Sequence, residues 1–428
     1  MNEVLLKGIK VVSPNTPFHN KQVNILIKNG VIEQITEHEA AEAAHTINAE
    51  GLSVSAGWFD LRASLTEPGF EFKDDVNSLS RSAAFGGFTD LAVLPNTYPA
   101  LETKESVEFV KARSFFQPVN MHVIAAMTKS CKGEEMTEMT DLYHAGAVAF
   151  SDGTHSSWNL GVLKRALMYV QAFDGLIIDL PEEPTMTEGG HMHEGITSTL
   201  MGTRGIPSIA EEIAIERSVS ILRYTGGQMH FSNISTAKAV DIIRKAKEEG
   251  LSVTCDVNAH HLYFKDTDLS DFDTNLKVKP PFRGESDVQA LWNGIQDGTI
   301  DAITSSHLPQ DQESKDLEFD LSDFGMLGLE TAFAALVSKK PDSVSIDVII
   351  EKLTEGPRKV LKLQQPVIEE GAKACLTIFD EHADWTFTEK DIKSKSKNTP
   401  FIGVSLKGKA LGIFNKDQAV LQDELKNR

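Results

Sequence analysis

From about residue 53 onward, short runs of apolar and β-branched residues alternate with amphipathic stretches. Side chains two apart share one face of a strand, and side chains three or four apart share one face of a helix. The strand-like runs cover residues 52–64, 88–96, 119–127, 147–152, 175–180, 228–235, 251–261 and 300–307. The helical stretches include residues 107–115, 160–170, 209–222, 237–249 and 288–295. This alternation predicts an α/β fold, a (β/α)8 barrel with its chemistry at the carboxyl ends of the strands.

Both ends of the chain are different, because short strands and turns replace the alternation. The clearest strands are residues 5–12, 22–27, 30–35, 374–380 and 401–406, and helices are predicted at 325–339 and 346–353. Asn29-Gly30 joins two of the strands and is a strong signal for a two-residue hairpin turn. The two ends therefore predict a mostly β-sheet unit.

Two helices are expected to begin at capping boxes, in which a serine and the residue three positions later bond each other's backbone. The pairs are Ser208 with Glu211 and Ser286 with Gln289. After the eighth run, residues 308–324 are rich in Asp and Glu and too polar for a core. This acidic segment is either a solvated loop or a mobile lid over the barrel mouth.

The composition narrows the class of protein. With 42 Lys and Arg against 62 Asp and Glu, the net charge of −20 argues against nucleic acid or an anionic membrane as partner. The 3 cysteines lie far apart without Cys-x-x-Cys spacing, which favours reduced thiols. No apolar stretch approaches the ~18 residues of a membrane span, and the first residues lack a leader pattern, so we expect a cytoplasmic protein.

Several stretches, in chain order, resemble dihydroorotases of the amidohydrolase superfamily. They include residues 65–69 (Leu-Thr-Glu-Pro-Gly), 84–89 (Ala-Phe-Gly-Gly-Phe-Thr), 94–97 (Leu-Pro-Asn-Thr), 279–283 (Lys-Pro-Pro-Phe-Arg) and 396–401 (Ser-Lys-Asn-Thr-Pro-Phe). One match would be weak, but collinear matches across nearly the whole chain are specific. The resemblance implies a barrel domain over residues 56–363 and a small β-sandwich domain built from residues 1–55 and 364–428.

The same resemblance implies a pair of zinc ions at the barrel mouth, and here the sequence departs from the family. The family's His-x-His strand aims two imidazoles at the metal, and a bridging acid, two further histidines and an aspartate complete the ligand set. The six matching positions in this chain are Arg62, Ser64, Asp152, Leu180, Asn233 and Ser306. Only Asp152 is suited to zinc, since a guanidinium has no lone pair and a lone hydroxyl is a poor ligand. We therefore expect no zinc and no other cofactor.

The catalytic and substrate-binding positions also differ from the family pattern. Ser306 replaces the carboxylate that moves a proton to the leaving nitrogen, a step for which serine is unsuited. Thr66 stands in the place of an arginine that grips the substrate's carboxylate by charge-assisted hydrogen bonds. Asn96, Lys279 and His307 are possible remnants of the substrate pocket. We assign no catalytic residue.

Other histidines offer a way to rebuild a metal site. His191 and His193 have His-x-His spacing in a glycine-rich loop, so either a solvated loop or a relocated metal site fits them. His260 and His261 match a His-His-Leu that active relatives carry without binding metal, which favours a structural role.

The retained acids raise a question of charge balance. A carboxylate left unpaired inside the barrel would be costly. Arg62 is therefore expected to form an ion pair with Asp152 or Glu182.

Three hypotheses for the function follow. The first is a non-catalytic dihydroorotase-like protein of de novo pyrimidine biosynthesis, which forms a homodimer and serves aspartate carbamoyltransferase as a structural or regulatory partner. The second is an active dihydroorotase, or a related cyclic amidohydrolase, with a rearranged or mononuclear metal site. The third is a small-molecule sensor that uses the old pocket.

Overall fold

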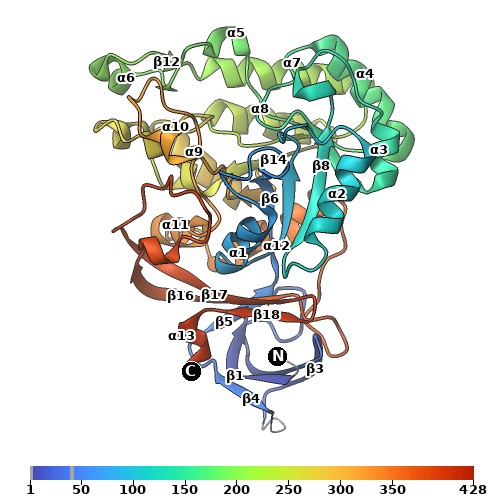
Figure 1. The fold of residues 1–428 in the computed structure, drawn as a ribbon, viewed down its shortest axis with the longest axis vertical. Coiled ribbons are helices and arrows are strands. Elements are labelled where there is room, and N and C mark those ends of the chain that lie inside the picture. Colours follow the sequence, from blue (N-terminus) through green and yellow to red (C-terminus); the bar gives the residue numbers. More distant parts are fainter. Residues whose placement is uncertain (1–2, 39–42) are drawn as a thin grey trace.

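The computed structural model describes residues 3–38 and 43–428, and its centre is a parallel barrel (Figure 1). Eight strands are neighbours in chain order: β6 (Trp58–Ser64), β7 (Phe88–Leu94), β8 (Asn120–Ala126), β9 (Ala147–Ser151), β10 (Ile177–Asp179), β13 (Met229–Phe231), β14 (Val253–Asn258) and β15 (Ala302–Thr304). Each lies within one of the predicted runs. The ring is nearly closed where β15 approaches β6, because the Ser64 amide donates to the His307 carbonyl over 2.8 Å. The predicted barrel is confirmed.

Helices follow the strands and surround the barrel (Figure 1). They are α1 (Val76–Phe85), α2 (Lys104–Ser114), α3 (Met139–Ala145), α4 (Leu160–Val170), α7 (Ile209–Thr225), α8 (Ala237–Glu248), α9 (Glu285–Gln296), α11 (Ala332–Lys339) and α12 (Ile346–Val360). Shorter elements lie in the loops: α5 (Pro184–Thr187), β11 (Met192–His193), α6 (Ile196–Met201), β12 (Gly205–Ile206), α10 (Gln312–Lys315) and α13 (Asp423–Lys426). Within the described ranges, no helix is long and apolar enough to cross a membrane.

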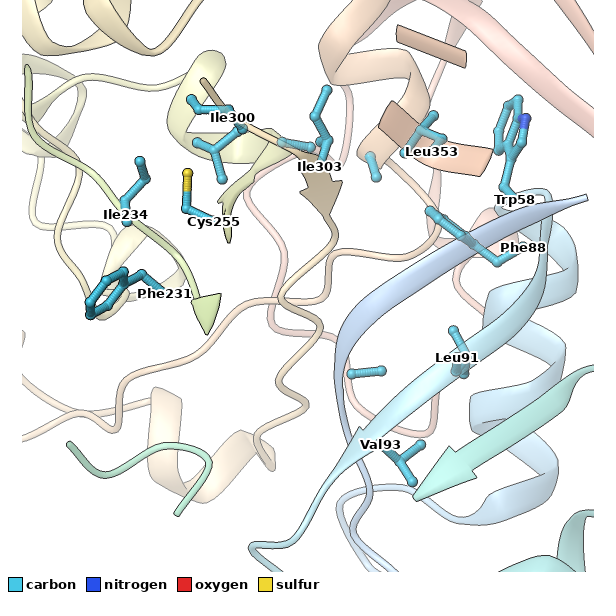
Figure 2. Close-up of a cluster of buried hydrophobic side chains, with 14 of the residues drawn as sticks. Trp58, Phe88, Leu91, Val93, Phe231, Ile234, Cys255, Ile300, Ile303 and Leu353 are labelled. Atoms are coloured by element: carbon cyan, nitrogen blue, oxygen red, sulfur yellow. The ribbon is translucent and has the colours of Figure 1, made fainter. Parts of the chain in front are cut away.

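The barrel strands bury both of their faces. Trp58, Phe88 and Leu91 belong to a cluster between the strands and the helices (Figure 2). Their neighbours Phe59 and Ala92 belong to a separate buried cluster. Successive side chains of a strand point to opposite faces, so burial of both faces requires apolar residues at nearly every position. This explains why the sequence shows continuous apolar runs here.

The two chain ends form one mostly β-sheet unit, as predicted (Figure 1). Its strands are β1 (Glu3–Val11), β2 (Gln22–Lys28), β3 (Val31–Thr36), β4 (His45–Asn48), β5 (Ser53–Ala56), β16 (Leu376–Thr386), β17 (Ser405–Asn415) and β18 (Gln418–Leu421). Their order is β18-β17-β16-β5-β1-β2-β3, with β4 paired to β1. Asn29 and Gly30 join β2 and β3 with φ of 50° and 72°, the left-handed pair that a tight hairpin requires.

Several predicted elements have different bounds in the structure. The strand predicted at residues 401–406 is wrong for most of its length, because β17 begins only at Ser405. Phe401 lies in a loop instead, fully buried, with its ring centre 5.1 Å from that of Phe264. Its apolar character reflects aromatic packing and not strand pairing. Helix α11 also begins later than predicted, at Ala332.

Neither predicted capping box forms. Ser208 precedes α7, but its side chain makes no capping bond. The buried Glu211 carboxylate turns away and accepts from the Ser235 amide over 2.8 Å, which ties α7 to the loop after β13. Helix α9 begins at Glu285, one residue before the predicted cap at Ser286. A tertiary contact of Glu211 has therefore replaced the local one.

A buried ion pair closes the barrel at the amino ends of its strands. Arg358 in α12 donates to the Gly57 carbonyl and to the Asp90 carboxylate, both over 2.7 Å. His122 contacts the other oxygen of Asp90 over 3.0 Å. Burial alone would raise the pKa of Asp90, but the hydrogen bond with His122 and the charge of Arg358 lower it to about 2.

We predict that Arg358→Met lowers the stability of the protein by about 3–5 kcal/mol, because it leaves the Asp90 carboxylate buried without its main partner. Urea unfolding followed by circular dichroism measures the loss as a lower midpoint. Arg223→Met, which breaks a half-exposed pair with Glu249, is the control and should cost less than about 1 kcal/mol. Equal midpoints for the two variants would contradict the stabilising role of the ion pair between Arg358 and Asp90.

Candidate functional site at the barrel mouth

The six positions singled out in the sequence come together at the carboxyl ends of the barrel strands. A cavity of about 460 Å³ opens there. Arg62, Ser64, Leu180 and Ser306 line the cavity. Asp152 and Asn233 are not among its lining residues, and each is only 1% exposed. The mouth is thus a concave site of the size that small-molecule ligands use.

Two side chains of β6 reach the cavity through a local irregularity of the strand. The pairing register between β6 and β7 shifts between Asp60 and Ala63. Arg62 lies within this shift and Ser64 lies just after it, and both line the cavity, whereas Ala63 packs in the cluster beneath the helices. Such bulges commonly re-aim side chains near functional sites.

Arg62 is buried and forms no ion pair with either expected partner. Its guanidinium donates to the Gly153 carbonyl over 3.2 Å and to the Ser232 hydroxyl over 3.4 Å. Within the described residues, no carboxylate oxygen lies within the 4.0 Å of an ion pair with Arg62. The expected pairing with Asp152 or Glu182 is therefore wrong. Burial lowers the pKa of Arg62, and the nearby charges of Asp256 and Asp60 oppose that shift.

Asp152 is turned away from the cavity. One of its carboxylate oxygens accepts from the Thr128 amide over 2.9 Å and the other from the Thr128 hydroxyl over 2.7 Å. Burial raises the pKa of Asp152 to about 6, despite these two bonds. Because Asp152 is bonded to Thr128 and does not line the cavity, its carboxylate is poorly placed to bridge metal ions there.

Asn233 and Ser306 bond each other where the family resemblance implies two metal ligands. The Asn233 amide nitrogen donates to the Ser306 hydroxyl over 2.8 Å. Both residues have left-handed backbones, with φ of 57° and 47°. Left-handed backbone is costly for residues other than glycine and gathers at functional sites. The loops therefore hold an unusual backbone conformation at both positions.

Asp256 and Asp60 form the polar floor below these residues, and the sequence analysis missed both. Asp256 accepts from the Ser232 hydroxyl over 2.9 Å and contacts His230 over 2.8 Å. Asp60 accepts from the Ser305 amide over 2.9 Å and from the Ser305 hydroxyl. The signal for Asp256 and Asp60 was an acid between two apolar neighbours of a strand, because such an acid has to find partners when it is buried.

The acidic segment after β15 forms part of the cavity wall. Leu308, Pro309 and Phe324 line the mouth. The segment is held from inside by a buried lysine, because the Lys277 amine donates to the carbonyls of Phe319 and Ser322, each over 2.7 Å. It contains the short helix α10 and is more than a solvated loop.

The three possible pocket remnants lie in different surroundings. Asn96 and Lys279 line the cavity, and Lys279 forms an ion pair with Glu182 over 2.8 Å. His307 is fully buried and does not line the cavity. Its Nδ1 accepts from the Gly328 amide over 3.1 Å, so His307 fixes the loop that packs on β15.

The residues at the mouth do not fit the zinc pair that the resemblance implies. Arg62 and Leu180 offer no lone pair, and Asn233 and Ser306 are bonded to each other. Within residues 3–38 and 43–428, no group of three or more His, Cys, Asp or Glu side chains could hold a metal ion.

The alternative histidines have protein partners of their own. His193 contacts the Arg283 guanidinium over 3.1 Å, whereas His191 lies 3.9 Å from Asp320. Burial lowers the pKa of His260 to about 3 and that of His261 to about 4, so both rings are neutral at pH 7. Each is within hydrogen-bonding distance of a protein oxygen.

Comparison with known proteins identifies relatives along the whole chain. A family model described as dihydro-orotase-like matches residues 52–239, and the amidohydrolase family model matches residues 182–414. A protein named dihydroorotase from Acetivibrio thermocellus is 38% identical, with 99% of this chain and 100% of the relative covered. A dihydroorotase from Pelotomaculum thermopropionicum is 37% identical, with 99% of each chain covered.

Solved structures match the fold. The L-hydantoinase (dihydropyrimidinase) from Arthrobacter aurescens superposes with a TM-score of 0.85 at 22% identity, covering 99% of this chain and 96% of that one. A D-hydantoinase superposes with a TM-score of 0.84 at 17% identity. At such identities the likeness establishes the barrel and the accompanying sheet unit.

We predict that Asp152→Asn makes the protein more stable at pH 7. A carboxyl whose pKa is raised in the folded state stabilises the fold below the unfolded pKa, near 3.8, and loses that contribution as the pH rises through about 6. The variant has no such loss, so its advantage should grow between pH 4 and pH 7, to at most about 3 kcal/mol.

Urea midpoints measured across this pH range test the prediction, with the exposed Asp423→Asn as control. A lower midpoint for Asp152→Asn at pH 7, together with loss of bound metal, would show instead that Asp152 is a ligand.

Proposed function

Since this chain belongs to the dihydroorotase-like amidohydrolases, we propose that it is a member of that family that does not carry out metal-dependent ring opening. Its role is that of a structural or regulatory partner of aspartate carbamoyltransferase in de novo pyrimidine biosynthesis. The observation that carries the non-catalytic part is the Arg62 guanidinium among the positions that would otherwise bind metal.

The chemistry of cyclic amide hydrolysis explains why an arginine at position 62 argues against catalysis. A metal polarises the carbonyl and lowers the pKa of bound water from about 15.7 to about 7. A carboxylate then moves the proton to the leaving nitrogen. Arg62 supplies positive charge but no ligand, Asp152 is occupied by Thr128, and Ser306 is bonded to Asn233. These contacts leave neither a set of metal ligands nor the family's proton-transferring carboxylate among the described residues at these six positions.

A second candidate is an active dihydroorotase or a related cyclic amidohydrolase with a rearranged site. Full-length relatives that carry the name dihydroorotase favour this candidate, and they weigh more heavily toward activity than toward a scaffold. The retained Asn96 in the cavity is consistent with it. The mouth would then have to rearrange around Arg62 before metal could bind. The two candidates differ most directly in bound zinc and in turnover.

The partner and the oligomeric state are part of the proposal. A protein without catalysis keeps its fold only when the fold itself is used, for example by a bound protein. We propose a homodimer that acts in the cytoplasm and binds the transcarbamoylase through its surface. A stable assembly of this kind buries roughly 1,200–2,000 Å².

We predict that the purified protein contains less than about 0.1 zinc per chain after expression with added zinc, because Arg62 and Leu180 cannot serve as ligands. Mass spectrometry of the elements measures the content. Turnover of dihydroorotate and of carbamoyl aspartate should be undetectable. The Acetivibrio thermocellus dihydroorotase, prepared in parallel, is the control. Stoichiometric zinc, or turnover in either direction, would establish the second candidate instead.

We also predict that the protein co-elutes with the aspartate carbamoyltransferase of its own organism when the two are co-expressed. Size-exclusion chromatography with light scattering gives the masses of the complex and of each protein alone. Separate elution, with a transcarbamoylase that is stable and fully active alone, would refute the partner role.

A further inference from the structure

We propose that a small phosphate monoester binds in a second cavity, where the last strands of the chain meet helix α1. This cavity has a volume of about 440 Å³ and is lined by residues of α1, β17, β18 and the short helix α13 (Figure 1). Among the residues that the structure describes, none lines both this cavity and the barrel mouth. The second cavity is therefore separate from the site to which the proposed function refers.

Three cations at the second cavity have no acidic partner. They are Arg81 in α1 and Lys390 and Lys393 in the loop between β16 and β17. In the described part of the chain, no carboxylate oxygen lies within the 4.0 Å of an ion pair with any of them. The Lys393 ammonium lies 4.5 Å from the centre of the Phe85 ring, which attracts the cation without neutralising it. An anion in the cavity would therefore meet three positive charges.

The acids that line the second cavity already have partners. Glu424 pairs with Lys409 over 2.6 Å, Asp423 pairs with Lys426 over 3.0 Å, and Asp391 accepts from the Thr388 amide over 2.8 Å. The two ion pairs cancel, whereas the hydrogen bond from Thr388 leaves the charge of Asp391 in place. Three unpaired cations against one acid give the cavity a positive balance, although the whole chain carries a net charge of −20. Such a local excess of positive charge attracts an anion.

The loop that carries the two lysines is held in place by buried acids. The Lys393 amide donates to the Glu330 carboxylate over 3.2 Å, and the Ser394 hydroxyl donates to the Asp74 carboxylate over 2.8 Å. Glu330 and Asp74 are both buried. The backbone of a loop fixed in this way has little conformational freedom left to lose when a ligand binds.

The rest of the wall is partly apolar and favours a ligand with an organic body. Ala84, Phe85, Val420 and Leu421 line the second cavity beside the charged groups. A phosphate monoester suits both parts of the wall. Its phosphate carries a charge of about −1.5 to −2 at pH 7 and three acceptor oxygens, which match several cations better than a carboxylate does. Its organic body can cover the apolar side chains.

Calorimetric titration of the full-length protein tests the proposal with three probes. Phenyl phosphate has a ring and a phosphate, inorganic phosphate lacks the ring, and benzoate has the ring with a single charge. We expect phenyl phosphate to bind with a Kd below about 1 mM and the other two to bind at least about ten-fold more weakly. Inorganic phosphate as tight as phenyl phosphate would overturn the organic body, and benzoate as tight would overturn the phosphate. A Kd of phenyl phosphate above about 1 mM would overturn the site.

Variants locate the binding. Arg81→Met combined with Lys393→Met should weaken phenyl phosphate at least about ten-fold, because each removes a charge-assisted contact. Lys397→Met is the matched control, since Lys397 belongs to the same loop but pairs with Glu389 over 3.3 Å and does not line the cavity. It should leave the Kd unchanged. If the double variant unfolds, Lys390→Met replaces it, at an exposed position, with an expected loss of about three-fold.

The same variants separate this proposal from the proposed function. If zinc occupied the barrel mouth, a phosphate ester would be able to bind to the metal there. Neither Arg81 nor Lys393 lines the mouth, so such binding would persist in the double variant. Undiminished binding by the folded double variant therefore overturns the second site. Stoichiometric zinc in the same samples overturns the proposed function and leaves the second site standing if the double variant has lost its affinity.

Discussion

The meeting of the first and last barrel strands is the constraint on which the mouth depends. β15 approaches β6 through the Ser64 amide and the His307 carbonyl, and Asp60 binds the backbone and side chain of Ser305. This contact brings Arg62 and Ser306 to one cavity although they are far apart in the sequence. A nearly closed barrel fixes these positions whatever side chains occupy them. The fold can therefore stay the same when the side chains at the mouth, and with them the chemistry, change.

The charged side chains at the mouth differ in the partners that surround them. None of the carboxylates that the structure describes is close enough to Arg62 for an ion pair, yet Arg62 lies in the field of Asp256 and Asp60, which partly offsets the cost of burying it. Asp152 finds its hydrogen bonds at Thr128, away from Arg62. Glu182 has Lys279. Asp152 and Glu182 thus each have a local donor, whereas the hydrogen bonds of Arg62 go to the neutral groups Gly153 and Ser232.

Much of the fold could be predicted from the sequence, because periodicity and turn chemistry are local signals. The eight strands, the (β/α)8 barrel and the hairpin at Asn29 and Gly30 follow from such signals. The errors arose where a tertiary contact overrode a local one. Glu211 left its expected cap to bind Ser235, and Phe401 is apolar because it packs on aromatic rings.

The candidate site, like the fold, could be predicted from the sequence only in part. Position along the chain predicted that Arg62, Ser64, Leu180 and Ser306 lie together, because strand ends meet at one mouth. The direction in which each side chain points could not be predicted, since it depends on partners far away in the sequence. Asp152 points to Thr128, and His307 to the backbone of Gly328. Asp256 was missed because a lone acid in a strand carries no motif.

A metal-dependent active site at the mouth would require two changes in the present structure. Arg62 belongs to a strand whose side chains are buried from Trp58 to Ser64, so moving it out of the mouth requires repacking of β6 against its neighbours. Asp152 would also have to leave two hydrogen bonds to Thr128. Both changes cost free energy before any metal binds. Metal binding at the mouth therefore requires a conformation different from the present one.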